Sequence, residues 1–139
     1  MASIFTRIIN GEIPGRFVWR DDVAVAFLDV RPLAPGHCLV VPIVEIDRWT
    51  DLPAPVANHL MAVAHAVANA QQLVFSPPRV GMMIAGFDVP HTHIHIFPTH
   101  AMSAFDFAQA DTKPDASALD ANAVALRVAL RAAGHTAAT

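Results

Sequence analysis

Apolar residues recur along the chain with the spacing of helices in three places. Apolar residues at positions 4, 5, 8 and 9 lie between Ser3, a favourable helix N-cap, and Gly11, a typical helix stop, which predicts a short N-terminal helix. Apolar residues three or four positions apart also run over 56–74 and over 119–130. We therefore expect a long helix in the middle of the chain and a further helix near the C-terminus.

Other segments alternate between apolar and polar residues or form short apolar runs, as strands do. The predicted strands cover residues 16–20, 23–30, 37–41, 79–85 and 91–97. The first two are joined by a predicted turn at Asp21-Asp22. Because helices and strands are mixed without a repeating strand–helix–strand unit, the pattern predicts an α+β fold with an antiparallel sheet.

The chain shows no internal repeat and no linker composition. We therefore expect a single domain over 1–139, which is long enough to bury a hydrophobic core. The core of this domain is expected in residues 1–100, and a C-terminal loop and helix in 101–134.

Composition narrows the class of protein. Hydrophobic residues make up 54% of the chain and charged residues 15%, which excludes intrinsic disorder for most of it. The purest aliphatic stretch, 38–44, is interrupted by Pro42 and is far shorter than the roughly 20 residues that a spanning helix needs. The first residues lack a signal-peptide layout, so we expect a cytoplasmic protein without a membrane partner.

Charge and cysteine content exclude two further classes. The net charge is −3 and there is no basic run, so binding to duplex DNA or RNA is not expected. Cys38 is the one cysteine, which makes an internal disulfide impossible.

The segment His91-Thr92-His93-Ile94-His95-Ile96-Phe97-Pro98 carries the strongest chemical signal. Side chains alternate faces along a strand, so the three histidines point to one face and the residues between them point to a core. Imidazole rings buried on one face need hydrogen-bond partners or a function.

Two chemistries suit such a row of imidazoles, and the pattern alone does not choose between them. Imidazole is a common zinc ligand, although three rings in a straight line do not converge easily on one ion. Alternatively, one imidazole attacks a phosphorus atom while its neighbours orient it and bind the phosphoryl oxygens. Such a cluster can also give a weakly acidic protein local positive character.

The three histidines resemble the motif of the histidine triad (HIT) superfamily. Other segments resemble the same family in the same order, over roughly residues 1–100. These segments are Ser3-Ile4-Phe5 with Ile8-Ile9, Glu12-Ile13-Pro14, Ala26-Phe27-Leu28-Asp29 and Pro35-Gly36-His37-Cys38-Leu39-Val40-Val41-Pro42.

The resemblance implies a five-stranded antiparallel sheet with one long central helix, a short N-terminal helix and a C-terminal helix, in a protein that forms a homodimer. It also implies that His93 is the nucleophile, that His91 orients it, and that His95 contacts the phosphate or the leaving group. His37 would complete the cluster and Asp29 would bind the ribose hydroxyls. The implied base pocket consists of Ile4, Phe5, Ile8, Phe27 and Leu39.

The implied activity is cleavage of a phosphoanhydride, as in a dinucleoside polyphosphate, or of a phosphoramidate bond next to a nucleoside monophosphate. The reaction would pass through a nucleotidyl-histidine and would need no metal or other cofactor. Phe87, Asp88, Leu28 and Glu45 depart from the residues that many family members carry. A non-catalytic nucleotide-binding protein and a metal-dependent hydrolase therefore remain as alternatives.

Overall fold

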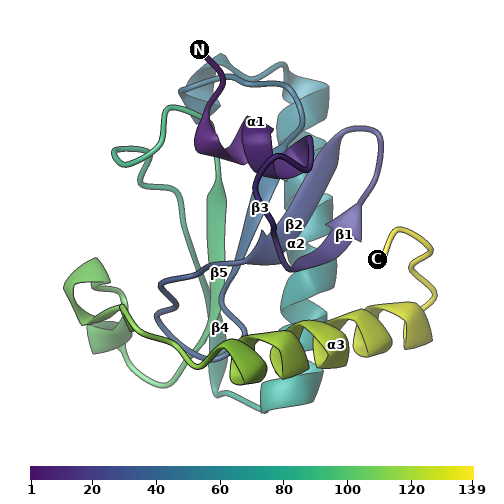
Figure 1. Cartoon of the computed structure of the whole chain (residues 1–139). Helices are drawn as coiled ribbons and strands as arrows, with labels where there is room; N and C mark the ends of the chain where they lie inside the picture. Colours follow the sequence, from purple (N-terminus) through teal and green to yellow (C-terminus); the bar gives the residue numbers. More distant parts are fainter.

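The computed structural model describes all 139 residues and confirms the predicted α+β fold (Figure 1). Its five strands form one antiparallel sheet in the order β1-β2-β3-β5-β4. The strands are β1 (Phe17–Arg20), β2 (Ala24–Leu28), β3 (Cys38–Pro42), β4 (Arg79–Met83) and β5 (Ile94–Thr99). The α-helices are α1 (Ile4–Ile9), α2 (Ala54–Phe75) and α3 (Ala116–Ala132).

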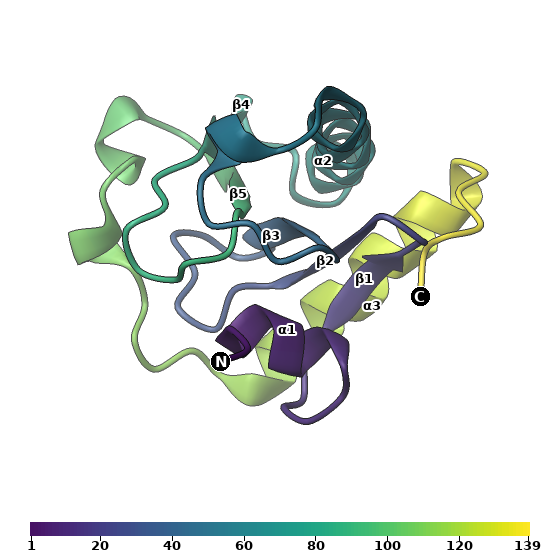
Figure 2. The ribbon, with the colours of Figure 1, turned by 90° about the horizontal axis from the view of Figure 1, so that it is seen from above.

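The two faces of the sheet are covered by different helices, as the view from above shows (Figure 2). Alternate residues of β2, β3 and β5, such as Ala26, Val40 and Ile94, join α2 and α3 in the larger apolar core. The intervening residues, such as Phe27 and Leu39, pack against α1 in a smaller core on the opposite face. β2 and β3 are therefore buried on both faces, which accounts for their almost uninterrupted apolar sequence.

The histidine segment differs from the prediction in where its strand begins and ends. β5 starts at Ile94, so His91 and His93 lie just before the strand. Val40 pairs with Ile94, and continuing that register would set Pro42, which has no N–H, opposite Thr92. Thr92 instead donates its backbone N–H to the carbonyl of Ile46, at 2.8 Å.

The predicted end of this strand at Pro98 is also wrong. β5 continues through Pro98, which pairs with Val80 of β4. The pairing between β3 and β5 stops at Ile96, so at Pro98 the strand has a neighbour on one side and proline is tolerated. No helix of the chain is both long enough and apolar enough to span a membrane.

Gly36 lies directly before His37 and packs under the end of α2. Its φ is +88°, and a Cβ added there would overlap the ring of Phe75. Glycine is thus required at this position both by the backbone conformation and by the close approach of the helix.

Gly36→Ala is expected to lower the free energy of unfolding by about 3 kcal/mol, because an overlap with a packed ring adds to the cost of a left-handed alanine. Gly134→Ala is the matched control, because Gly134 has a φ of +93° and a Cβ added there would meet no other atom within 4 Å. Urea denaturation measures both. Equal losses in the two variants would contradict the packing argument.

Candidate active site

The four predicted catalytic histidines lie together on the α1 side of the sheet, and all four are buried. His91 and His93 come from the segment before β5, His95 from β5 itself, and His37 from the residue before β3. The rings of His93 and His95 have centroids 5.0 Å apart, and those of His37 and His95 are 5.2 Å apart. The alternation read from the sequence therefore holds even where the chain is outside the strand.

The backbone fixes the hydrogen position on His93. Its Nδ1 lies 2.7 Å from the carbonyl oxygen of His91, and a carbonyl can only accept. Nδ1 therefore carries the hydrogen, and in the neutral ring the lone pair is on Nε2. The ring of Phe5 meets the His93 ring edge to face at 4.9 Å and limits how it can rotate.

His91 is held by two bonds that also fix its tautomer. Its Nε2 lies 2.8 Å from the carbonyl oxygen of Pro42, so Nε2 donates. Its Nδ1 then accepts from the hydroxyl of Ser3, at 2.7 Å. The His91 ring is fully satisfied when neutral, and its backbone carbonyl is thereby held in place for His93.

Ser3 belongs to a small polar network that ties α1 to the histidines. Its side chain accepts from the backbone N–H of Thr6 and so caps the helix. The backbone N–H of Ser3 and the hydroxyl of Thr6 both donate to Glu45 Oε1, at 2.7 and 2.6 Å. The bonds from Thr6 and Ser3 lower the pKa of Glu45 to about 2. Glu45, a departure in the sequence, thus anchors the helix that covers the site.

His37 and His95 form a hydrogen bond whose direction is set by a backbone N–H. Leu33 donates its N–H to His37 Nδ1 at 2.9 Å, so the hydrogen of the neutral His37 ring is on Nε2. That Nε2 lies 3.0 Å from His95 Nδ1 and donates to it. The remaining nitrogen of His95, Nε2, therefore carries a hydrogen that can be donated to a ligand.

Asp29 follows β2 and lies beside this histidine pair. Its Oδ2 is 3.6 Å from His37 Nε2 and 3.8 Å from His95 Nδ1, and its Oδ1 accepts from the backbone N–H of Arg31. Burial raises the pKa of Asp29, against the lowering effects of the Arg31 bond and the Arg31 guanidinium. The carboxylate of Asp29 thus stabilises the turn after β2 through one oxygen and faces the two histidines with the other.

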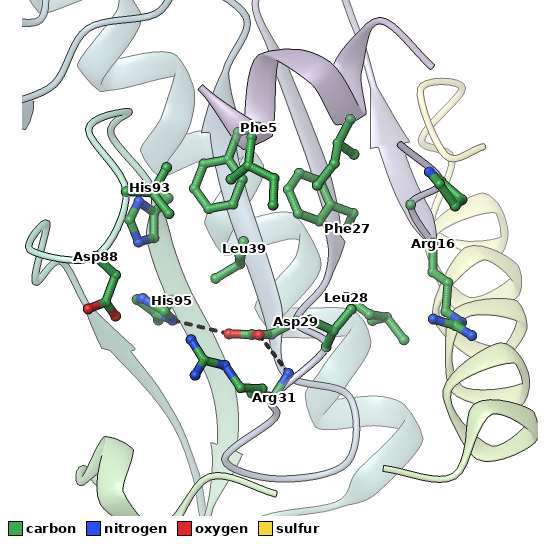
Figure 3. Close-up of a pocket in the computed structure, with 16 residues that line it drawn as sticks. Phe5, Arg16, Phe27, Leu28, Asp29, Arg31, Leu39, Asp88, His93 and His95 are labelled. Carbon is green, nitrogen blue, oxygen red and sulfur yellow. Dashed lines mark hydrogen bonds and ion pairs between the residues drawn. The ribbon is translucent and has the colours of Figure 1, made fainter. Parts of the chain in front are cut away.

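One pocket collects the predicted binding residues (Figure 3). Among the residues that line it are Ile4, Phe5, Ile8, Phe27, Asp29, Leu39, His93 and His95. Phe5, Phe27 and Leu39 form an apolar part, while the histidines and Asp29 form a polar end (Figure 3). His37 and His91 do not line this pocket and act from behind it.

The structure adds residues that the sequence reasoning missed or left open. Arg31 lines the polar end of the pocket and was not predicted; its place two residues after Asp29 is the one signal that could have found it. Asp88 also lines the pocket and lies on the same side of it as His93 and His95 (Figure 3). Phe87, in contrast, is 96% exposed and is not among the lining residues.

Burial opposes the expected positive character at three of the four histidines. Burial lowers the pKa of His37 to about 3, and that of His95 to about 4, with smaller contributions from neighbouring histidines. Burial also lowers the pKa of His91. Desolvation disfavours the charged imidazole, so these rings are neutral near pH 7.

Comparison with known proteins identifies the family of this chain. The family model for the HIT domain matches residues 10–102. The chain belongs to the HIT family. It is 37% identical over 101 residues to an uncharacterized HIT-like protein of Methanocaldococcus jannaschii, covering 70% of this chain and 78% of that one. It is 32% identical over 100 residues to the purine nucleoside phosphoramidase of Escherichia coli, covering 68% and 84%.

A solved zinc-bound histidine triad family protein from Mycobacterium smegmatis is also similar to this HIT protein. The two share 25% identity and a TM-score of 0.82, with 96% of each chain covered. This confirms the HIT fold with its five-stranded sheet and three helices. Because that protein binds zinc, the donor groups of the present chain were compared with what a metal ion needs.

The best donor set for a metal in this HIT protein is Asp29, His37 and His95, whose ligand atoms lie within 4.8 Å of one another. A metal ion would need the lone pair of His37 on Nε2. The Leu33 N–H already occupies the lone pair on Nδ1, so Nε2 holds the hydrogen. These residues therefore do not fit a metal in the arrangement observed.

Stability is expected to fall as the pH is lowered from 7 to 5. The unfolded histidines take up protons near pH 6.5, whereas the buried rings of His37, His91 and His95 take them up only at lower pH. The folded state thus loses about 2 kcal/mol for each of His37 and His95 over this interval, and His91 changes stability in the same direction. Urea denaturation at both pH values measures the change.

His37→Gln removes one of these groups and is expected to reduce the pH-dependent loss, whatever its effect on stability at pH 7. His65→Gln, at an exposed position on α2, is the matched control and should leave the loss unchanged. A wild-type protein equally stable at pH 5 and pH 7 would show that these three histidines are not held neutral.

Proposed function

We propose that this HIT protein is a nucleotide hydrolase that cleaves a phosphoramidate or phosphoanhydride bond next to a nucleoside monophosphate. The observation that carries the proposal is the bond from His93 Nδ1 to the carbonyl of His91, at 2.7 Å. It leaves the Nε2 lone pair on a ring that lines the pocket, as a nucleophile requires.

The pocket suggests how the nucleotide is placed. The base would lie among Ile4, Phe5, Ile8, Phe27 and Leu39, all of which line the apolar part. The ribose hydroxyls would donate to the carboxylate of Asp29. The phosphate would then lie between His93 and His95, where the Nε2 hydrogen of His95 is available to a phosphoryl oxygen or to the leaving atom.

The reaction has two displacements at phosphorus. His93 Nε2 attacks, the bond from phosphorus to the leaving nitrogen or oxygen breaks, and that atom takes the electron pair and a proton from solvent. Water then attacks the nucleotidyl-His93, the nitrogen–phosphorus bond breaks, and its electron pair returns to Nε2. The water proton passes to solvent, and the nucleoside monophosphate is released. His91 orients the nucleophile through its carbonyl and is a positioning residue.

The relatives favour the phosphoramidate over the phosphoanhydride. The E. coli relative is named a purine nucleoside phosphoramidase, and a relative from Saccharomyces cerevisiae, 33% identical over 98 residues, is named an adenosine 5'-monophosphoramidase. The carboxylate of Asp88 at the polar end of the pocket also favours a phosphoramidate substrate, since it would repel a polyphosphate.

The same carboxylate supports a second candidate function, a nucleotide-binding protein without turnover. A negative charge beside the phosphate disfavours an anionic substrate and opposes charge building on the phosphoryl oxygens. This candidate and the hydrolase differ in whether a nucleotidyl-His93 forms.

A homodimer that joins two sheets is proposed as well, in a protein that we expect in the cytoplasm. β4 is an edge strand with a free row of backbone groups, and Met82 on it is 41% exposed. Trp49 and Met61, each 52% exposed, line an apolar groove together with Met82. A second copy of the chain would cover this surface and pair the two β4 strands.

His93→Ala is expected to reduce the hydrolysis of adenosine 5'-phosphoramidate by a factor of at least about 10³, because the nucleophile is lost. Release of adenosine monophosphate measures turnover, and mass spectrometry of rapidly quenched wild type detects one added nucleotidyl group. His65→Ala is the control and should behave like the wild type.

Activity of His93→Ala close to the wild-type value would refute the nucleophile. If the wild type forms no nucleotidyl adduct and hydrolyses neither phosphoramidates nor dinucleoside polyphosphates, while adenosine monophosphate binds, the non-catalytic candidate is correct.

Met82→Glu is expected to convert the dimer into a monomer, because two carboxylates would face each other across the joined edges. Val128→Glu, at a 57% exposed position on α3, is the matched control and should remain dimeric. Sedimentation velocity distinguishes the two states. A monomeric wild type would contradict the proposed assembly.

A further inference from the structure

A second pocket lies at His95, beside the one that would hold the nucleoside. Both pockets share Asp29, Arg31, Asp88 and His95, but the second is closed by Phe107 in place of the apolar residues of α1. A substrate whose phosphorus lies at the shared residues would therefore extend in two directions, its nucleoside into one pocket and its leaving group into the other.

The wall of the second pocket comes from the segment between β5 and α3, most of which lies beyond the residues matched by the HIT domain family model. The ring of Phe107 packs against the His95 ring at a tilt of 56°, with centroids 4.8 Å apart. The backbone N–H of Asp111 donates to the carbonyl of Pro32 at 2.9 Å, which fastens the segment to the loop that carries Arg31. The chain itself thus supplies both walls of the pocket.

The charges around this pocket leave one carboxylate without a counter-charge. The Arg31 guanidinium acts on Asp29, whose pKa it lowers, so these two opposite charges largely offset each other. His37 and His95 beside Asp29 are neutral near pH 7. Asp88 is exposed and takes part in no ion pair within 4.0 Å. The net charge facing a leaving group is therefore negative.

We propose that this second pocket is the leaving-group subsite and that Asp88 makes it selective for amines that carry a positive charge. The proposal rests on the proposed phosphoramidate hydrolysis and adds the chemical class of the group that is released. An ammonium group on the leaving amine is attracted by Asp88, and its carbon chain packs on the ring of Phe107. An anionic leaving group, such as a second nucleotide, is repelled.

Coulomb's law gives the size of the effect for two charges that share one small pocket. Unit charges about 6 Å apart, at an effective dielectric constant between that of a protein surface and that of water, change a rate constant by about tenfold. Cationic and anionic leaving groups of equal size are therefore expected to differ by more than about tenfold in kcat/KM. This parameter reports the first displacement, in which the leaving group is still bound.

The test uses three adenosine 5'-phosphoramidates that differ in one terminal group. The amines are ethylenediamine, ethanolamine and β-alanine, which end in an ammonium, a hydroxyl and a carboxylate. For the wild type at pH 7 and low salt, kcat/KM is expected to fall in that order. Asp88→Asn is expected to bring all three values within about threefold of one another, because the charge is removed and the shape is kept.

Asp22→Asn is the matched control, since Asp22 is an exposed carboxylate in the turn between β1 and β2, and it should keep the wild-type order. Asp88 is exposed, and thermal melting of Asp88→Asn checks that the fold is retained. Raising the salt concentration should narrow the wild-type spread through screening.

Three results would overturn the inference. Equal values for the three substrates in the wild type would show that no charge selection exists. An unchanged order in Asp88→Asn would assign the selection to another residue, and a preference for the β-alanine substrate would assign it to Arg31. If the wild type hydrolyses none of the three substrates and does not hydrolyse adenosine 5'-phosphoramidate either, the proposed function on which the inference rests is refuted.

Discussion

Hydrogen bonds from imidazole rings to the backbone determine how this site is arranged. The carbonyl of His91 fixes the hydrogen of His93 on Nδ1, and the N–H of Leu33 fixes the hydrogen of His37 on Nε2. Each bond decides which nitrogen of a ring is free to react or to donate. Backbone groups do not titrate in the physiological range, so these directions persist where side-chain partners would change their protonation. The proposed nucleophile and the proposed donor are thus fixed by the fold itself.

The sheet separates the larger apolar core from the face that carries the candidate site residues. Ile94 and Ile96 pack against α2 on one face, and His93 and His95 lie on the other, because neighbouring side chains alternate. α1 covers the histidine face, and its N-cap residue Ser3 also donates to His91. The N-terminus of α1 is therefore tied directly to the orientation of the His91 ring.

The sequence predicted those parts of the structure that depend on local periodicity. The helices and strands of the core followed from apolar spacing, and the facing of the triad followed from alternation. The start of β5 was missed because it depends on Pro42, a residue distant in sequence that cannot continue the ladder. The position of Phe107 against His95 was also beyond reach, because it depends on how a polar loop returns to the sheet. The direction of the Asp88 side chain could not be predicted either, because loop sequences lack the periodicity that indicates side-chain direction in helices and strands.

The neutrality of His37, His91 and His95 affects how the proposed reaction would be stabilised. With His37, His91 and His95 uncharged near pH 7, the phosphate meets N–H donors and the side chain of Arg31 more than a positively charged cluster. Attack by His93 places a positive charge on its own ring, and the carbonyl of His91 accepts from the Nδ1 hydrogen of that ring. Charged neighbours would oppose this new charge in a buried site, where screening is weak. Burial of the other histidines therefore favours the covalent step, because it leaves His93 as the ring on which positive charge develops.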